Sequence, residues 1–337
     1  MSGFNQFANI LTSQERARAH PTLSRSKRFA MSTAKFTKAK SLTGVFAAVL
    51  ACASVQTSSV LAQDTASTEA VYMSGAERVT AGGHMRTAAQ QIAVASCFLD
   101  AGIEADTFRE QINQSVTVFD DNINALRDGN AALGVQTPEE GRKLLSTIYS
   151  VTSQWTPFKE ASHARLQGGG VMDGTDYVSR HNLNMMHTSQ YLLREIIAGY
   201  AIPPALLQSD AFTMDVLTRQ PAIGFQIAKE ACGLITGNTV MGSAARFDKS
   251  VDRFDASMGA LVNGFEGVGV SAPPTPEARA ALESVSAEWT TLKDELAQVK
   301  GSNDVVLALS IYRKFDTIND QFEAIIPLYI EASKSGI

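Results

Sequence analysis

The stretch that decides the fold is IAVASCFLDAG at residues 92–102, which returns as IAKEACGLITG at residues 227–237. The offset is 135 residues, and it places Cys97 and Cys232 in register. Chance rarely keeps cysteines and apolar positions in one register over such a distance. We therefore infer that the chain contains two diverged copies of one unit.

The same register continues beyond this stretch. At an offset of 135, three short matches pair Ser115-Val116 with Ser250-Val251, Phe119-Asp120 with Phe254-Asp255, and Ala125-Leu126 with Ala260-Leu261. After a small change in length, Trp155 pairs with Trp289 and Lys159 with Lys293. The duplication therefore extends well beyond the two cysteine segments.

Apolar residues in both copies are spaced by three and four positions, which is typical of amphipathic helices in a bundle. In the first copy they are Ile112, Val116, Phe119, Ile123 and Leu126, then Ile148, Val151, Trp155 and Phe158. In the second copy they are Phe247, Val251, Phe254, Met258 and Leu261, then Leu282, Val285, Trp289 and Leu292. Strand-type alternation is absent over any useful length, so we predict an all-α protein.

Glycine and proline indicate where these helices end. The breaks fall at residues 129–138, 168–170, 203–204 and 270–276. We predict helices near residues 76–102, 105–128, 138–165 and 175–200, and a second set over about 212–335. The predicted fold is two tandem antiparallel four-helix-bundle-like repeats, at residues 75–205 and 210–335, after an N-terminal signal peptide. Whether the repeats form two bundles or one elongated body stays open.

The N-terminal 63 residues have the pattern of an export leader. Three lysines precede an apolar run at residues 42–55, and a small-residue cleavage pattern follows at residues 60–62. The run is about 14 residues long, whereas a membrane-spanning helix needs roughly 20. We predict a leader with a signal peptide at residues 1–63, cleavage near Ala62, a linker at residues 64–74 and a periplasmic or secreted location.

The start, the processing and the structure of this leader each have an alternative interpretation. The charged segment before the apolar run is unusually long, and translation from Met31 would give a leader of ordinary length. Lipidation of Cys52, which follows Val49-Leu50-Ala51, would instead make a lipoprotein, although leucine at the middle position is atypical. A buried amphipathic helix is a further reading, which the charge and the cleavage pattern disfavour.

The rest of the chain is acidic. Residues 1–63 hold eight basic residues and one acidic residue, so the formal charge of -5 leaves -12 for residues 64–337. Nucleic-acid affinity rests mainly on Lys and Arg contacts with phosphates, so we expect no nucleic-acid binding. No segment after the leader approaches 18 consecutive apolar residues, so we also expect no transmembrane anchor.

The sequence gives little support for the haem and metal sites that helical bundles often contain, or for a catalytic site. The Cys-x-x-Cys-His motif of c-type haem is missing, and the Glu-x-x-His sequence from Glu160 to His163 has no histidine in the second copy. His181, Met185, Met186 and His187 would suit copper, but histidines six positions apart lie on different helix faces. No phosphate loop, nucleophile elbow or zinc-protease motif occurs. We predict no metal, no cofactor and no enzymatic activity.

Cys97 and Cys232 could form a disulfide with each other or remain free thiols. If the copies pack about a twofold axis, equivalent residues near that axis meet, and an oxidising compartment would allow a disulfide. Otherwise each is a buried free cysteine of its own bundle. Nothing in the sequence locates the axis, and we prefer the free cysteines.

The segment GHMRTAAQQIA at residues 83–93 resembles a known family. It is similar to the first helix of the PilJ domain, the N-terminal sensor domain of type IV pili methyl-accepting chemotaxis transducers. That domain is also similar to the periplasmic part of nitrate/nitrite sensor kinases. The family helix reads Gly-x-x-Arg-Met-x-Ser-Gln-Arg-x-Ala. The residues that fit it are Gly83, Arg86, Gln90, Ile92 and Ala93, whereas Thr87 replaces Met and Ala89 replaces Ser.

The second copy carries the same resemblance less completely. It keeps residues 226–232, but Pro221 stands at the arginine position and Arg219 lies two residues earlier. Trp155 and Trp289 resemble the family's third-helix tryptophan. The likeness covers most of residues 75–335.

The resemblance implies an extracytoplasmic module that detects a small ligand. In the nitrate-sensing relatives the first-helix arginine contacts the anion, and a guanidinium offers an oxyanion a planar fork of donors. Arg86 would take this role with His84 and Gln90 beside it, and Arg219 and Gln226 are the candidates in the second copy. The alternative is an exposed or salt-bridged Arg86. Pro221 implies that at most one copy keeps such a site.

We therefore predict an exported sensor-type protein that binds a small ligand, an oxyanion in the most specific version. Relatives that signal across a membrane carry spans and a kinase or methyl-accepting region, which we do not find after the repeats, so we expect a protein partner to carry the signal. One alternative is a periplasmic helical scaffold without a small ligand. Another is a metal- or redox-binding bundle.

Overall fold

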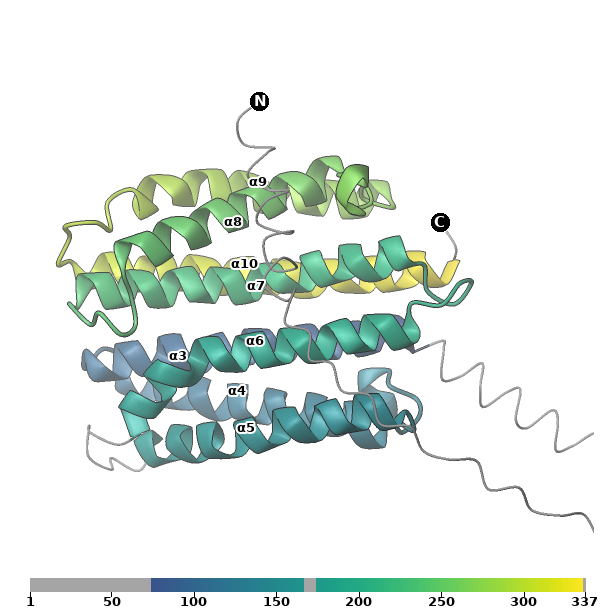
Figure 1. The fold of residues 1–337 in the computed structure, drawn as a ribbon. Coiled ribbons are helices and arrows are strands. Elements are labelled where there is room, and N and C mark those ends of the chain that lie inside the picture. Colours follow the sequence, from purple (N-terminus) through teal and green to yellow (C-terminus); the bar gives the residue numbers. More distant parts are fainter. Residues whose placement is uncertain (1–73, 167–173, 336–337) are drawn as a thin grey trace, which may run out of the picture. The chain divides into compact units, whose positions relative to one another are not determined.

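The computed structural model describes residues 74–166 and 174–335, which belong to one compact unit, Ala66–Ile337. The described residues form eight α-helices: α3 (Gly75–Asp100), α4 (Ala105–Asp128), α5 (Arg142–Leu166), α6 (Gly174–Tyr200), α7 (Gln208–Ile235), α8 (Ala244–Asn263), α9 (Pro276–Leu296) and α10 (Val305–Ser335) (Figure 1). They contain no strand, so the all-α prediction is confirmed. The predicted leader, including Met31, Cys52 and Ala62, lies outside the described residues, as does the glycine run at 168–170.

The predicted apolar stripes form the core. All their residues are buried except Val251, which is half-buried. The largest boundary differences are at the start of α7, predicted near residue 212 and observed at Gln208, and at the start of α5, predicted at residue 138 and observed at Arg142. Glu139 delays the helix, because its backbone N–H donates to the Arg127 carbonyl at 2.9 Å and its side chain accepts from the Gly141 N–H.

The turns repeat at the offset found in the sequence. Glycines with positive φ occur in pairs 135 residues apart: Gly102 with Gly237, Gly129 with Gly264, and Gly134 with Gly269. Gly129 and Gly264 end α4 and α8 at φ values of 80° and 74°, where other residues would be strained. Each is followed by a short 3₁₀ helix, Ala131–Leu133 or Glu266–Val268. The α4–α5 and α8–α9 connections therefore have the same local structure.

An Asp–Trp–Lys cluster also occurs twice. In each cluster an indole Nε1–H and a lysine ammonium bind one aspartate, which ties the second helix of a set to the third. The members are Asp120, Trp155 and Lys159 in the first set, and Asp255, Trp289 and Lys293 in the second. The indole-to-carboxylate distances are 2.7 and 2.8 Å. These pairs explain why the sequence kept both tryptophans, aspartates and lysines in register.

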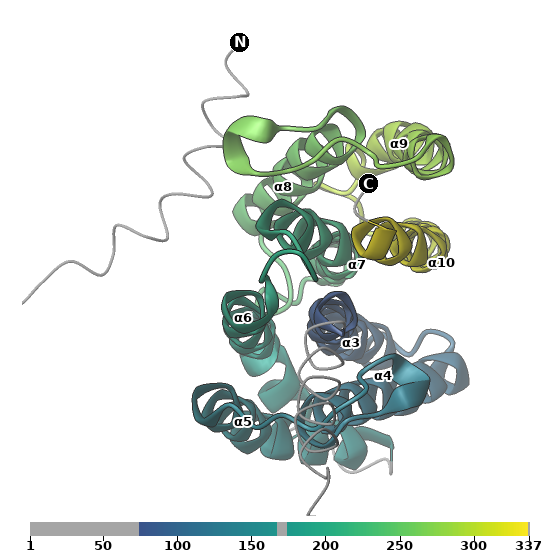
Figure 2. The same cartoon turned by 90° about the vertical axis from the view of Figure 1, so that its right-hand side faces the viewer.

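Helices α3 and α7 are buried on nearly all sides, unlike the amphipathic helices around them. Small and apolar residues occur on every side of both helices, as expected of a central helix, together with a few buried charged residues. α3 packs on α4, α6 and α7, and α7 packs on α3, α8 and α10 (Figure 2). The first four helices and the second four therefore share an interface along the α3–α7 pair.

The α3–α7 pair runs parallel and in register. Cys97 and Cys232 form a disulfide with a Cα–Cα distance of 6.3 Å. Gly83 approaches Thr218, also 135 residues later, so closely that a Cβ at position 83 would collide with it. Our preference for two free cysteines is therefore wrong, because equivalent residues of α3 and α7 face each other.

Candidate functional site

A buried network of charged and polar side chains crosses the α3–α7 interface. Arg86 of α3 is 1% exposed, and its guanidinium donates from Nη1 to Asp215 Oδ1 at 2.6 Å. Its Nη2 donates to Thr218 Oγ1 at 3.0 Å and to the Asp215 carbonyl at 3.2 Å. Gln190 of α6 accepts a further hydrogen bond from Nη1, and Arg219 binds the second oxygen of Asp215. Two guanidiniums thus share one carboxylate.

The charges of this network are strongly coupled. Burial lowers the pKa of Arg86 to about 10, with Asp215 opposing the shift and Arg219 adding to it. Burial opposes the charge on Asp215, but Arg219 and Arg86 hold the pKa of its carboxyl below the ordinary value. The carboxylate is therefore ionised at neutral pH, and the group carries a net positive charge.

The network has more buried donors than acceptors. Arg86 Nε, Gln190 Nε2 and Arg219 Nε are each buried without a hydrogen-bond partner among the described residues. In the described part of the chain, buried unpaired acceptors lie outside the network, at Gln90 Oε1 of α3 and at Gln220 Oε1, Gln226 Oε1 and Glu230 Oε2 of α7. Buried donors without acceptors are costly, so this arrangement suits an added acceptor, either an anion or water.

More positive charge lies beside the network on α6 and α8. The half-buried Arg253 of α8 has no hydrogen bond or ion pair within the described part of the chain, and burial together with Arg219 lowers its pKa, while Glu230 opposes that shift. Partial burial, then Arg253 and Arg194, lower the pKa of His187. Burial and neighbouring positive charge thus both disfavour the charged forms of Arg253 and His187, which an anion bound beside them would relieve.

Further along α7, a second group of buried charges lies beside α6. Lys229 is 1% exposed and donates to Asn182 Oδ1 at 2.9 Å. Burial lowers its pKa to about 8, although the buried Glu230 next to it acts in the opposite direction. No sequence motif singled out either residue.

The structure brings two of the five predicted ligand residues together, Arg86 and Arg219, and gives Gln90 and Gln226 separate partners. Arg86 and Arg219 meet at Asp215, Gln90 donates to the Asn182 carbonyl at 3.3 Å, and Gln226 donates to Glu230 at 2.9 Å. His84 lies elsewhere, because its Nε2 is 3.1 Å from Glu323 of α10 on an exposed surface. Arg86 is salt-bridged, as in the alternative interpretation: its guanidinium binds the carboxylate of Asp215.

Sequence reasoning missed Asp215, Gln190, Thr218 and Arg253. Asp215 carried a usable signal, because an acid in the mostly apolar stretch at residues 211–217 requires a buried cation. Gln190 and Arg253 had none, since only the packing of α6 and α8 places them here. Met185 and Met186 pack in the core, and the described residues hold no group of three His, Cys, Asp or Glu side chains placed for a metal.

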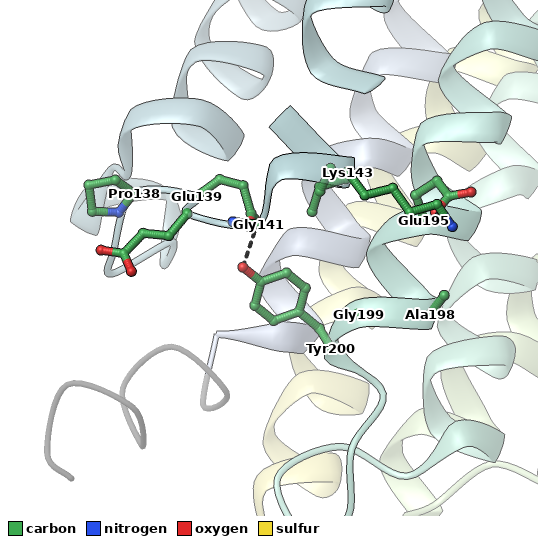
Figure 3. Close-up of a pocket in the computed structure, with 10 residues that line it drawn as sticks. Pro138, Glu139, Gly141, Lys143, Glu195, Ala198, Gly199 and Tyr200 are labelled. Carbon is green, nitrogen blue, oxygen red and sulfur yellow. Dashed lines mark hydrogen bonds and ion pairs between the residues drawn. The ribbon is translucent and has the colours of Figure 1, made fainter. Parts of the chain in front are cut away.

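A separate cavity of about 360 Å³ lies between the start of α5 and the end of α6 (Figure 3). Its wall contains three glutamates and one lysine, together with apolar residues such as Pro138, Leu144 and Ala198. Sequence reasoning did not identify this cavity.

Among the residues that the structure describes, no helix combines the length and the apolar character needed to cross a membrane. The chain matches no curated protein and no solved structure. Residues 71–178 match the family model of the PilJ domain, the N-terminal domain of type IV pili methyl-accepting chemotaxis transducers. The match covers α3, α4, α5 and the first residues of α6, so this part of the chain is similar to a PilJ-type sensor domain.

Proposed function

We propose that the chain is a non-enzymatic, exported sensor module built from two PilJ-like repeats, at residues 75–205 and 210–335, which binds a small oxyanion and signals through a protein partner. The PilJ match supports the sensor role for the first repeat. The repeated turns and Asp–Trp–Lys clusters support a second repeat. The Cys97–Cys232 disulfide fits an oxidising compartment.

One observation carries the oxyanion proposal: Arg86 Nε, Gln190 Nε2 and Arg219 Nε are buried without acceptors in one network. Arg253 adds a guanidinium without an ion pair in the described residues. An oxyanion offers several acceptor atoms and one negative charge, which match the unpaired donors and the surplus positive charge. Asp215 already occupies the fork of Arg86, so the ligand binds on the Arg219–Arg253 side.

Binding at this position would report to both sets of helices. Arg86 belongs to α3, Gln190 to α6, Arg219 to α7 and Arg253 to α8. A ligand that draws these side chains together changes how the four helices pack, and a ligand shifts a population by its difference in affinity for the two packings. The partner would recognise that difference.

Isothermal titration with nitrate, nitrite and acetate tests this proposal. We expect heat with at least one anion, and at least tenfold weaker binding in Arg253→Gln, because a charged hydrogen bond contributes roughly 1.5–3 kcal/mol. Arg109→Gln is the control, since it removes the same charge from an exposed site on α4. Absence of heat in the wild type ends the oxyanion version, and unchanged heat in Arg86→Ala removes Arg86 from the site.

The occupied fork of Arg86 favours a second candidate, a helical scaffold without a small ligand. Arg86 then acts only as a structural ion pair with Asp215. A pull-down from a periplasmic extract separates the candidates. The scaffold predicts a stoichiometric protein partner in anion-free buffer, whereas the sensor predicts that the anion changes partner binding.

A further inference from the structure

The cavity between α5 and α6 is made of residues that the charged network does not use. Its volume of about 360 Å³ is in the range of small-ligand pockets, roughly 300–1,000 Å³. Glu139, Glu140 and Glu195 supply three carboxylates to its wall, and Lys143 supplies the single ammonium (Figure 3). The balance of charge on the wall is negative.

Glu139 is already fully engaged within the protein. Its Oε1 accepts from the Gly141 N–H at 2.7 Å, and its Oε2 accepts from the Tyr200 hydroxyl at 2.6 Å and lies 3.5 Å from Arg78. Arg78 also stacks over the Tyr200 ring at 4.5 Å. Glu139 is therefore held by the protein itself and is not open to a ligand, and its bond to Gly141 offsets the positive end of α5.

Glu195 is differently placed. Its side chain is 14% exposed, and its partner at 2.6 Å is the ammonium of Lys143, whose side chain is 77% exposed. The long, solvated Lys143 of α5 thus pairs with a largely buried carboxylate of α6, and both side chains line the cavity (Figure 3). The ammonium of this pair is solvated, so competition with water and the entropy of the long lysine side chain weaken its hold on Glu195.

We propose that this cavity binds a small primary ammonium with a short aliphatic chain, whose charged group replaces Lys143 at Glu195. The exchange keeps Glu195 paired, and Lys143 returns to solvent. The negative end of α6, at Ala198 to Tyr200, adds to the attraction for a cation. Leu144, Pro138 and the open side of Gly199 receive the aliphatic chain.

The test is an NMR titration of the full chain with n-butylammonium, followed through the backbone amides of Gly141 and Gly199. n-Butanol has the same shape without the charge, and butyrate has the opposite charge. We expect saturable shifts at both glycines with n-butylammonium and none with the other two. Equal shifts with n-butanol, or shifts with butyrate alone, overturn the proposal.

Two substitutions should act in opposite directions. Glu195→Gln removes the charge that holds the ammonium and should weaken binding about tenfold. Lys143→Ala removes the internal competitor and should tighten binding about two- to fivefold. Lys300→Ala is the control, because this lysine is also ion-paired and about half exposed but lies far along the chain, beside Asp248. Weaker binding in Lys143→Ala overturns the exchange.

A third substitution tests the position of the aliphatic chain. A Cβ at Gly199 would meet nothing within 4 Å, so Gly199→Leu should fill the cavity without a clash and abolish the shifts. Gly259 of α8 is equally open, so Gly259→Leu should bind as the wild type does. Full binding in Gly199→Leu contradicts the proposed site. None of these residues belongs to the oxyanion network, so the two proposals fail separately.

Discussion

The first four helices, α3–α6, and the second four, α7–α10, share their framework and differ in their buried charges. Both sets have the same turn glycines and the same Asp–Trp–Lys cluster. Five buried positions of α3 and α7 differ in charge at the offset of 135: Arg78 corresponds to Thr213, Thr80 to Asp215, Arg86 to Pro221, Val94 to Lys229, and Ala95 to Glu230. The shared features hold each set together, whereas the unshared charges gather along the central α3–α7 interface and at the α5–α6 cavity.

The largest loss of stability should come from removing the disulfide that joins the two sets. The Cys97–Cys232 disulfide closes a loop of 135 residues, and Cys97→Ala/Cys232→Ala should lower the free energy of unfolding by about 4 kcal/mol because the unfolded chain gains entropy. Urea unfolding followed by circular dichroism measures the loss. Equal stability of the double variant and the wild type would show that the bond adds nothing to the interface.

Removing Arg86, one of the two buried arginines that only the first set has, should lower stability slightly less. Arg86→Leu leaves Asp215 with one cation instead of two in a buried site, and the unfolding free energy should fall by about 3 kcal/mol. In Arg86→Leu/Asp215→Leu the loss should be smaller than in the single variant, since no buried carboxylate remains underpaired. A double variant that loses as much stability as the Arg86→Leu and Asp215→Leu variants together would contradict the coupling of these two residues.

Lys229→Val converts a buried charge of the second set into the residue of the first set. The folded chain releases the Lys229 proton near pH 8, whereas the unfolded chain holds it to about pH 10.4. Because the unfolded state binds more protons between these values, the free energy of unfolding of the wild type should rise with pH there, by about 3 kcal/mol in total. Denaturant unfolding at pH 7.5 and pH 9.5 should show the rise in the wild type and not in the variant. The same rise in the free energy of unfolding in the wild type and in Lys229→Val would refute this explanation.

The smallest change in stability should come from substituting the tyrosine in the last helix of each set, Tyr200 in α6 or Tyr329 in α10. The Tyr200 hydroxyl donates to Glu139 at 2.6 Å, whereas the buried Tyr329 hydroxyl has no partner within the described residues. Tyr200→Phe should lower stability by about 1 kcal/mol, and Tyr329→Phe should be neutral or slightly stabilising. Thermal unfolding of the pair measures the difference. A larger loss in Tyr329→Phe would reverse the comparison.

The fold was largely predictable because apolar spacing and helix-ending residues are local signals. The stripes from Ile112 to Leu126 and from Leu282 to Leu292 identified their helices, and Gly129 and Pro203 identified breaks. The start of α5 was wrong, because Glu139 depends on tertiary partners, Arg78 and Tyr200.

The candidate site was predictable only in part. Arg86, Gln90, Arg219 and Gln226 could be named because a repeat and a family pattern align them. Their actual partners, Asp215 and Gln190, depend on how α3, α6 and α7 pack, which no local pattern reports. For the same reason the disulfide was not preferred, since only the parallel register of α3 and α7 brings Cys97 to Cys232.

Peptide mapping of the protein under non-reducing conditions tests most directly whether the two sets meet along a parallel, in-register α3–α7 pair. The arrangement predicts one linked pair of peptides, with Cys97 joined to Cys232, which separates on reduction. Free, alkylatable thiols at both positions, or a bond from either one to Cys52, would contradict it.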